Sequence, residues 1–110
     1  MQTEYYDKLE RLFESGLDTK EISLKSLELL EDEFQKHDEN ARWLANHYDS
    51  AAEYIAQEVF EMNDEDFSFF ENIAEQEICI FKKYGYETAC MEFALNRAKS
   101  DRSNLVHDLC

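Results

Sequence analysis

The sequence predicts an all-α protein, a single-domain bundle of about five helices with short connections. It contains no proline and only two glycines, Gly16 and Gly85, so the residues that usually punctuate β-turns are scarce. Apolar residues recur at steps of three and four, the spacing of one helix face. They make up 44% of the chain, enough for a core despite a net charge of -15, and 110 residues fit one acidic helical domain, 1–110.

The first two helices are expected at about 4–15 and 19–36. Gly16 provides a typical stop for the first helix, since glycine often ends helices in a left-handed conformation. Asp18, followed three residues later by Glu21, has the pattern of a capping box at the start of the second. The apolar faces of these helices are expected to contain Tyr5, Tyr6, Leu9, Leu12, Phe13, Ile22, Leu24, Leu27, Leu29, Leu30 and Phe34.

A third helix is expected over about 39–62, where apolar residues continue at the spacing of a bundle helix. Ser50 followed by Glu53 is a second capping-box pattern, so a break near Asp49 and Ser50 is the alternative to one continuous helix. The apolar seam of this segment consists of Ala41, Leu44, Tyr48, Ala51, Ile55, Val59 and Met62.

A fourth helix is expected to begin within 63–66 and to end at Lys82 and Lys83, because cations suit a helix C-terminus and Gly85 follows. A fifth is expected at about 87–99, and the tail 100–110 is expected either to add a short turn or to fray. The residues expected to be buried by these helices are Phe67, Phe70, Ile73, Ala74, Ile78, Phe81, Cys90, Met91, Phe93, Ala94, Leu95 and Ala98.

The three cysteines indicate a reducing environment. They are odd in number and form no CxxC pair, which argues against a disulfide framework or a zinc site. The N-terminal residues lack a signal-peptide pattern, and no apolar run approaches the length of a membrane span. The protein is therefore expected in the cytoplasm, with Cys79 and Cys90 buried and Cys110 exposed.

No motif predicts a metal site, a cofactor or a catalytic residue. The EF-hand ligand positions 1, 3, 5, 9 and 12 are occupied by Asp64, Asp66, Ser68, Asn72 and Glu75. The invariant glycine of that loop is replaced by Phe69, which excludes the calcium reading. No histidine follows a glutamate by three residues, as a dinuclear bundle requires, and HExxH, GxSxG and P-loop patterns are missing. The protein is not expected to be an enzyme.

The charge is unevenly distributed along the chain. Residues 1–42 contain twelve acidic and six basic side chains, residues 43–81 ten acidic and none basic, and residues 82–110 four acidic and five basic. This distribution disfavours direct binding to nucleic acid, whose phosphates would be repelled. A solvated acidic face that keeps the protein soluble is the simplest explanation.

Some of the acidic residues conflict with local helix physics. Carboxylates at 64–66 suit the N-terminus of the fourth helix. Glu58 and Glu61 instead lie in the last turn of the expected third helix, where the dipole disfavours anions. Glu71 and Glu75 are a like-charge pair four residues apart, with no basic residue nearby in sequence.

These conflicts suggest a surface selected for a positively charged partner, and the expected partner is a DNA- or RNA-binding enzyme or complex. The expected partner-binding residues are Asp49, Glu53, Glu58, Glu61, Glu71 and Glu75. In composition the chain resembles phage- or mobile-element-encoded inhibitors, such as DNA-mimicking anti-restriction and anti-CRISPR proteins, which are short, acidic and cytoplasmic. Trp43, Tyr48 and Tyr54 are candidate anchor residues if they are exposed, whereas helical spacing alone would place them in the core.

Two other functions fit the same sequence. One is a self-associating helical scaffold or adaptor, a homodimer whose interface is the seam from Ala41 to Met62. The other is an immunity protein or antitoxin that neutralises a basic nuclease.

Overall fold

The computed structural model describes the backbone of residues 3–108 and the side chains of residues 5–104. Over this range the protein is all-α, which confirms the predicted fold class. Its six helices are α1 (Thr3–Glu14), α2 (Thr19–Gln35), α3 (Glu39–His47), α4 (Ala51–Gln57), α5 (Asp64–Lys83) and α6 (Ala89–Asp108).

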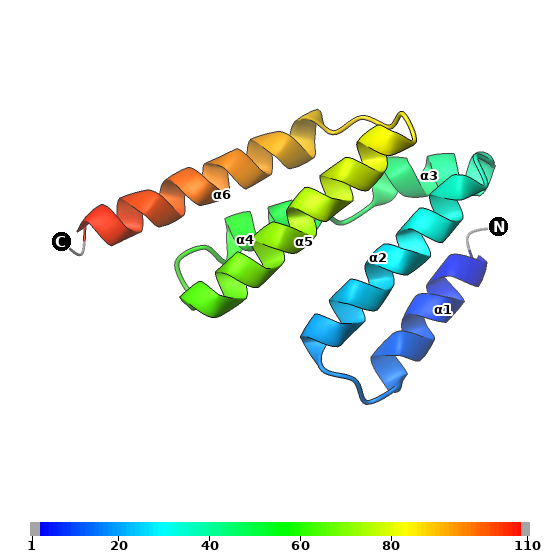
Figure 1. The fold of residues 1–110 in the computed structure, drawn as a ribbon, viewed down its shortest axis with the longest axis horizontal. Coiled ribbons are helices and arrows are strands. Elements are labelled where there is room, and N and C mark those ends of the chain that lie inside the picture. Colours follow the sequence, from blue (N-terminus) through cyan, green and yellow to red (C-terminus); the bar gives the residue numbers. More distant parts are fainter. Residues whose placement is uncertain (1–2, 109–110) are drawn as a thin grey trace.

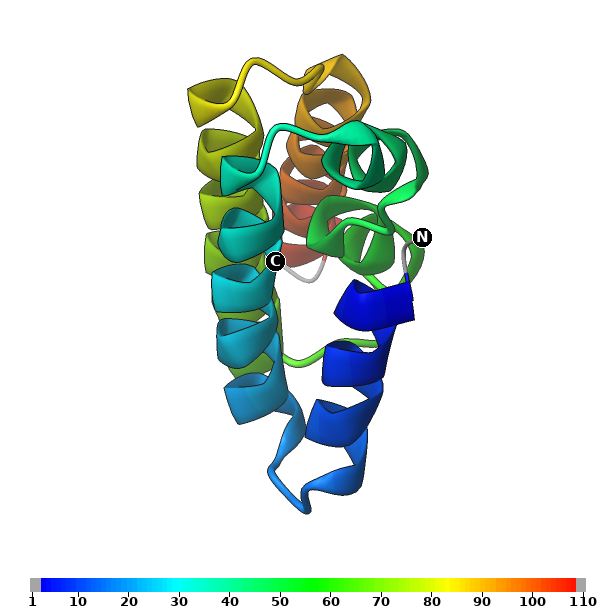
Figure 2. The same ribbon diagram turned by 90° about the vertical axis from the view of Figure 1, so that its right-hand side faces the viewer.

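The helices form two layers. Figure 2 shows α2 and α5 on one side of the molecule and α1, α3 and α4 on the other. Helices α1 and α2 form an antiparallel hairpin at one end of the long axis, and α6 runs to the opposite end (Figure 1). Gly16 has a φ of 82° in the hairpin turn, a left-handed conformation that glycine adopts without steric strain. The Asp18 carboxylate caps α2 by accepting the Glu21 N–H at 2.9 Å, as predicted.

Ion pairs connect the long helices near their ends and show their relative directions. Helices α2 and α5 are parallel neighbours, with Lys20 near Glu65 at their N-terminal ends and Lys83 2.9 Å from Glu31 near their C-terminal ends. Helix α6 returns antiparallel to α5, so that Lys82 meets Glu92 at 2.7 Å at the connected ends. The lysines of these pairs are exposed, so solvent screens the pairs and each contributes little to stability.

The prediction of one continuous helix over 39–62 is wrong, and the alternative break near Asp49 and Ser50 is where the chain changes direction. Helix α3 ends at His47, and Tyr48 is extended with a ψ of 130°. Ser50 then caps α4 by accepting the Glu53 N–H at 3.2 Å. Helix α4 is short because residues 58–62 form a turn before α5 begins.

The core lies between the two layers and is rich in aromatic rings. Phe34 packs against Phe81 with ring centroids 5.0 Å apart and against Tyr86 at 4.6 Å. The residues of the predicted seam belong to this core: Ala41, Leu44, Ile55 and Val59 are fully or almost fully buried by the chain's own helices.

Several side chains predicted to be buried are exposed. Both Cys79 and Cys90 are exposed, which corrects their assignment to the core. Phe93 is exposed because α6 buries Met91 and Leu95, and Phe93 lies on the opposite side of the helix.

Helix α6 also continues through residues 100–108, where a short turn or a frayed end was expected. Cys110 lies outside the described residues. Three further side chains from the predicted apolar faces are exposed: Tyr6, Phe13 and Leu24.

Candidate protein-binding surface and a buried carboxyl group

The six predicted partner-binding carboxylates come from two helices that pack against each other, α4 and α5. Asp49 and Glu53 lie at the start of α4, and Glu58 and Glu61 lie at its end and in the following turn. Glu71 and Glu75 lie in the middle of α5.

Glu71 and Glu75 are not isolated anions. Lys99 of α6 places its ammonium group 3.2 Å from Glu75 and 4.0 Å from Glu71. Lys99 is 24 residues from Glu75 in sequence, so the sequence offered no local cation for this pair although the fold supplies one. The lack of a basic residue nearby in sequence therefore does not leave this pair without a cation in the fold.

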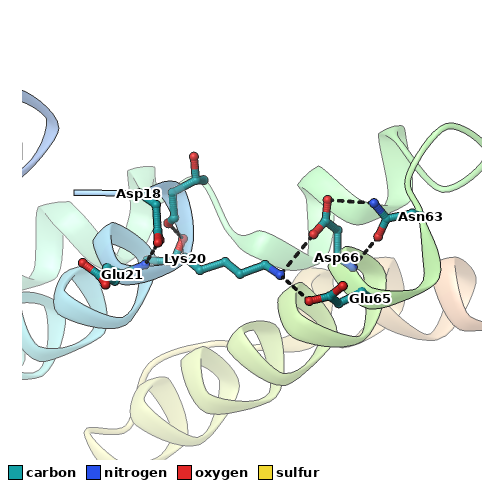
Figure 3. Close-up of polar contacts among 8 residues, drawn as sticks. Asp18, Lys20, Glu21, Asn63, Glu65 and Asp66 are labelled. Atoms are coloured by element: carbon teal, nitrogen blue, oxygen red, sulfur yellow. Dashed lines mark hydrogen bonds and ion pairs between the residues drawn. The ribbon is translucent and has the colours of Figure 1, made fainter. Parts of the chain in front are cut away.

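The carboxylates at the start of α5 are also neutralised. Asn63 caps the helix by accepting the Asp66 N–H at 2.8 Å, as helix-start chemistry predicts. Lys20 reaches across from α2 to within 3.3 Å of both Glu65 and Asp66, as Figure 3 shows. The segment of residues 64–75, which the EF-hand pattern had covered, is helical throughout. No cluster of three metal-ligating side chains occurs within the described residues.

The remaining four carboxylates form no ion pair with a described side chain. Asp49 and Glu53 suit the N-terminus of α4, whereas Glu58 is the C-cap residue and Glu61 follows it, where the helix dipole disfavours anions. Two aromatic side chains of the same segment are exposed, Tyr54 at 48% and Phe60 at 65%. We call this set the α4 surface: Asp49, Glu53, Tyr54, Glu58, Phe60 and Glu61.

The other two candidate anchors are placed differently. The Trp43 ring stacks on His47 with centroids 4.3 Å apart and meets Tyr6 edge-on, so it belongs to a ring cluster between α1 and α3. Tyr48 is mostly buried, and its hydroxyl group donates a hydrogen bond to Glu77. Of the three candidates, only Tyr54 lies on the α4 surface.

Glu77 is one of two buried glutamates among the described residues, with Glu33, and the sequence assigned it no role. Its side chain accepts the Tyr48 O–H at one oxygen and the Ala51 N–H, at 2.8 Å, at the other. Glu77 therefore joins α5 to both sides of the break between α3 and α4. Burial raises its pKa to about 7, although both hydrogen bonds act in the opposite direction. The position of Glu77 in the sequence could have indicated its burial, since it lies four residues after Ile73 and four before Phe81, on the core face of α5.

A cavity of about 310 Å³ lies next to Glu77, between the α1–α2 hairpin and the junction of α3 with α4. Four aromatic side chains line it: Phe13, Tyr48, Tyr54 and Phe70. Tyr54 and Phe70 meet edge-on with centroids 5.3 Å apart. Glu77 and Asp49 are the acidic residues of its lining, which includes no lysine or arginine. A larger groove of about 730 Å³ between α2 and α5 contains the exposed Cys79 and has no aromatic lining.

Comparison of the chain with protein-family models, with curated proteins and with solved structures found no match. Within the residues that the structure describes, no helix has the length and apolar character needed to cross a membrane.

Proposed function

We propose that the protein is a small inhibitor that binds through the α4 surface to the basic surface of a nucleic-acid-binding partner. One observation supports this proposal above the others. Lys20 and Lys99 pair with exposed carboxylates of α5, whereas no described side chain forms an ion pair with Asp49, Glu53, Glu58 or Glu61. Tyr54 and Phe60 are exposed in the same segment as these four carboxylates, so charge and apolar contact area occur together there.

The α4 surface combines the two elements of a tight charged interface. Its carboxylates would steer a basic partner into contact, because opposite potentials raise association rates. Tyr54 and Phe60 would supply the desolvated contacts that dominate binding energy at interfaces. Such a surface would occupy the groove in which the partner holds nucleic-acid phosphates, as anti-restriction and anti-CRISPR inhibitors of the DNA-mimic type do. An immunity protein or antitoxin against a basic nuclease would use the same surface.

A variant carrying D49N, E53Q, E58Q and E61Q is expected to lose its partner. The immobilised wild-type protein should retain a nucleic-acid-binding protein from a host lysate at about 50 mM salt, and duplex DNA should release that protein, because protein and DNA compete for one basic surface. The quadruple variant should retain at least about tenfold less. Binding is measured by quantitative mass spectrometry of the eluates.

The matched control carries E10Q, E14Q, E28Q and D32N, which remove the same number of charges from exposed positions of α1 and α2. It should retain the partner as the wild type does. Equal losses in both variants would show that net charge alone attracts the partner. If duplex DNA does not release the retained protein, the DNA-mimic proposal is contradicted.

The burial of the seam argues against the scaffold alternative. A dimer through the seam from Ala41 to Met62 would need side chains that the chain already buries in its own core. Multi-angle light scattering at about 10–100 μM is therefore expected to give the mass of one 13.1 kDa chain. A stable dimer that persists in the quadruple variant would favour the scaffold.

A further inference from the structure

We propose that the cavity beside Glu77 is a binding site for an organic cation with an alkylammonium head group. Its lining combines four aromatic rings with the carboxylates of Glu77 and Asp49 and includes no basic side chain. Aromatic rings attract cations through their negative faces, and quaternary ammonium groups are the best-known ligands of such sites. At about 310 Å³, the cavity lies at the lower end of the size range of small-molecule sites.

The buried carboxyl group of Glu77 lacks a counter-ion among the described residues. Glu77 is only 3% exposed, and each of its oxygens accepts a hydrogen bond, one from Tyr48 and one from Ala51. No cation among the described residues pairs with it, so an ionised Glu77 is a buried charge without a counter-ion. A cationic ligand in the adjoining cavity would provide that counter-ion.

The walls of the cavity suit the apolar part of such a ligand. Ile22 and Ile73 contribute aliphatic surface, and Tyr54 and Phe70 form an edge-on pair. The hydroxyl groups of Ser23 and Ser26 donate to carbonyl oxygens of their own helix at 2.9 and 2.8 Å. Their hydrogens are thus engaged, which leaves oxygen lone pairs rather than donors for a ligand. The site therefore offers acceptors and ring faces, as a cation requires.

Binding should depend on pH, since a cation interacts more strongly with the carboxylate than with the carboxylic acid. Burial raises the pKa of Glu77 to about 7. The titratable groups around it are Tyr5 of α1, Tyr48 and Asp49 of the α3–α4 junction, and Glu33 of α2 beside Tyr5. The pKa values of both tyrosines are raised by burial, so these two groups stay neutral across this range. Affinity for the cation is expected to fall as the pH is lowered from 8 to 5.5.

The test is an NMR titration of the ¹⁵N-labelled full chain with choline chloride at constant ionic strength. The neutral isostere 3,3-dimethylbutan-1-ol and the lysine side-chain analogue Nα-acetyl-lysine N-methylamide serve as parallel ligands. Choline is expected to cause saturable shifts of the amide resonances at Ser50, Ala51 and Tyr54, with the neutral alcohol about tenfold weaker. Tighter binding of the lysine analogue than of choline would assign the site to a partner's lysine side chain, and the reverse would assign it to a free small cation.

Variants separate the site from general charge attraction. Tyr54→Leu should weaken choline binding about fivefold, whereas Tyr6→Leu, at another exposed tyrosine that does not line the cavity, should leave it unchanged. Glu77→Gln should weaken the binding of choline, leave that of the alcohol unchanged and remove the dependence on pH.

Equal binding of choline and the alcohol, or equal effects of the two tyrosine changes, would overturn the proposal. So would shifts that do not saturate. The inference does not depend on the proposed function, because a free cation can bind whether or not the α4 surface has a protein partner.

Discussion

Replacing Arg102 with alanine is expected to lower the free energy of unfolding by about 2–3 kcal/mol. The guanidinium group donates to the carbonyl oxygens of Val59 and Met62 at 2.6 and 2.5 Å, and to the Asp64 carboxylate at 2.5 Å. It also lies over the ring of Phe67, 5.2 Å from its centroid. The change leaves two carbonyl groups of the turn between α4 and α5 without these donors and removes the packing of the arginine stem.

Urea denaturation followed by far-UV circular dichroism measures this effect. The matched control is Arg97→Ala on the same helix, where the side chain is exposed and its pair with Asp101 spans 3.9 Å. This control should cost at most about 0.5 kcal/mol. The Arg102 variant should also melt roughly 10 °C below the wild type. Equal stabilities of the two variants would mean that the contacts of Arg102 do not hold the turn in place.

Replacing Glu77 with glutamine is expected to change how stability depends on pH. The carboxyl group of Glu77 has its pKa raised to about 7 from the ordinary value of 4.5, so the folded state binds this proton more tightly than the unfolded state does. Its contribution to stability is therefore complete below about pH 4.5 and is lost as the pH rises through 7. Relative to E77Q, the wild type should lose on the order of 3 kcal/mol between pH 4.5 and pH 8.

The comparison with E77Q isolates this one group. Glutamine can still accept the Ala51 N–H through its carbonyl oxygen, and its amide can donate to the Tyr48 hydroxyl oxygen, so the junction stays satisfied at every pH. Changes in the overall charge of the chain affect both proteins alike.

The control is E75Q, at an exposed position of the same helix whose pair with Lys99 is worth little, and it should track the wild type at both pH values. Urea unfolding at pH 4.5 and pH 8 measures the effect. A constant difference between the wild type and E77Q would show that Glu77 is not perturbed by its burial.

Local signals in the sequence located most of the helix boundaries. Asp18, Ser50 and Asn63 each cap the helix that follows, through hydrogen bonds from backbone N–H groups three residues later. The continuous third helix was mispredicted because the apolar seam keeps its helical period across Ser50. The spacing of the seam indicates which side chains are buried. Two shorter helices separated by a break can bury the same side chains as one continuous helix.

Burial of individual residues was less predictable. Cys79 lies between Ile78 and Ile80 in an apolar run, yet it faces an open groove because α2 and α5 pack through other positions. Glu77 shows the opposite case, a carboxyl group on the core face whose partners are the Tyr48 hydroxyl and the Ala51 amide. Hydropathy describes the average preference of a residue type, whereas exposure depends on which neighbour covers that position.

The sequence by itself determined the all-α class, the caps and the excess of negative charge, because each depends on residues within one or two helical turns of each other. Only the tertiary structure decided which carboxylates remain unneutralised. Lys20, Lys99 and Arg102 reach acidic residues 24 to 46 positions away, and they leave the α4 surface as the part of residues 43–81 whose exposed carboxylates form no ion pair with a described side chain. Electrostatic neutralisation depends on the distance between charges in space. For residues far apart in sequence, that distance is set by the packing of the helices.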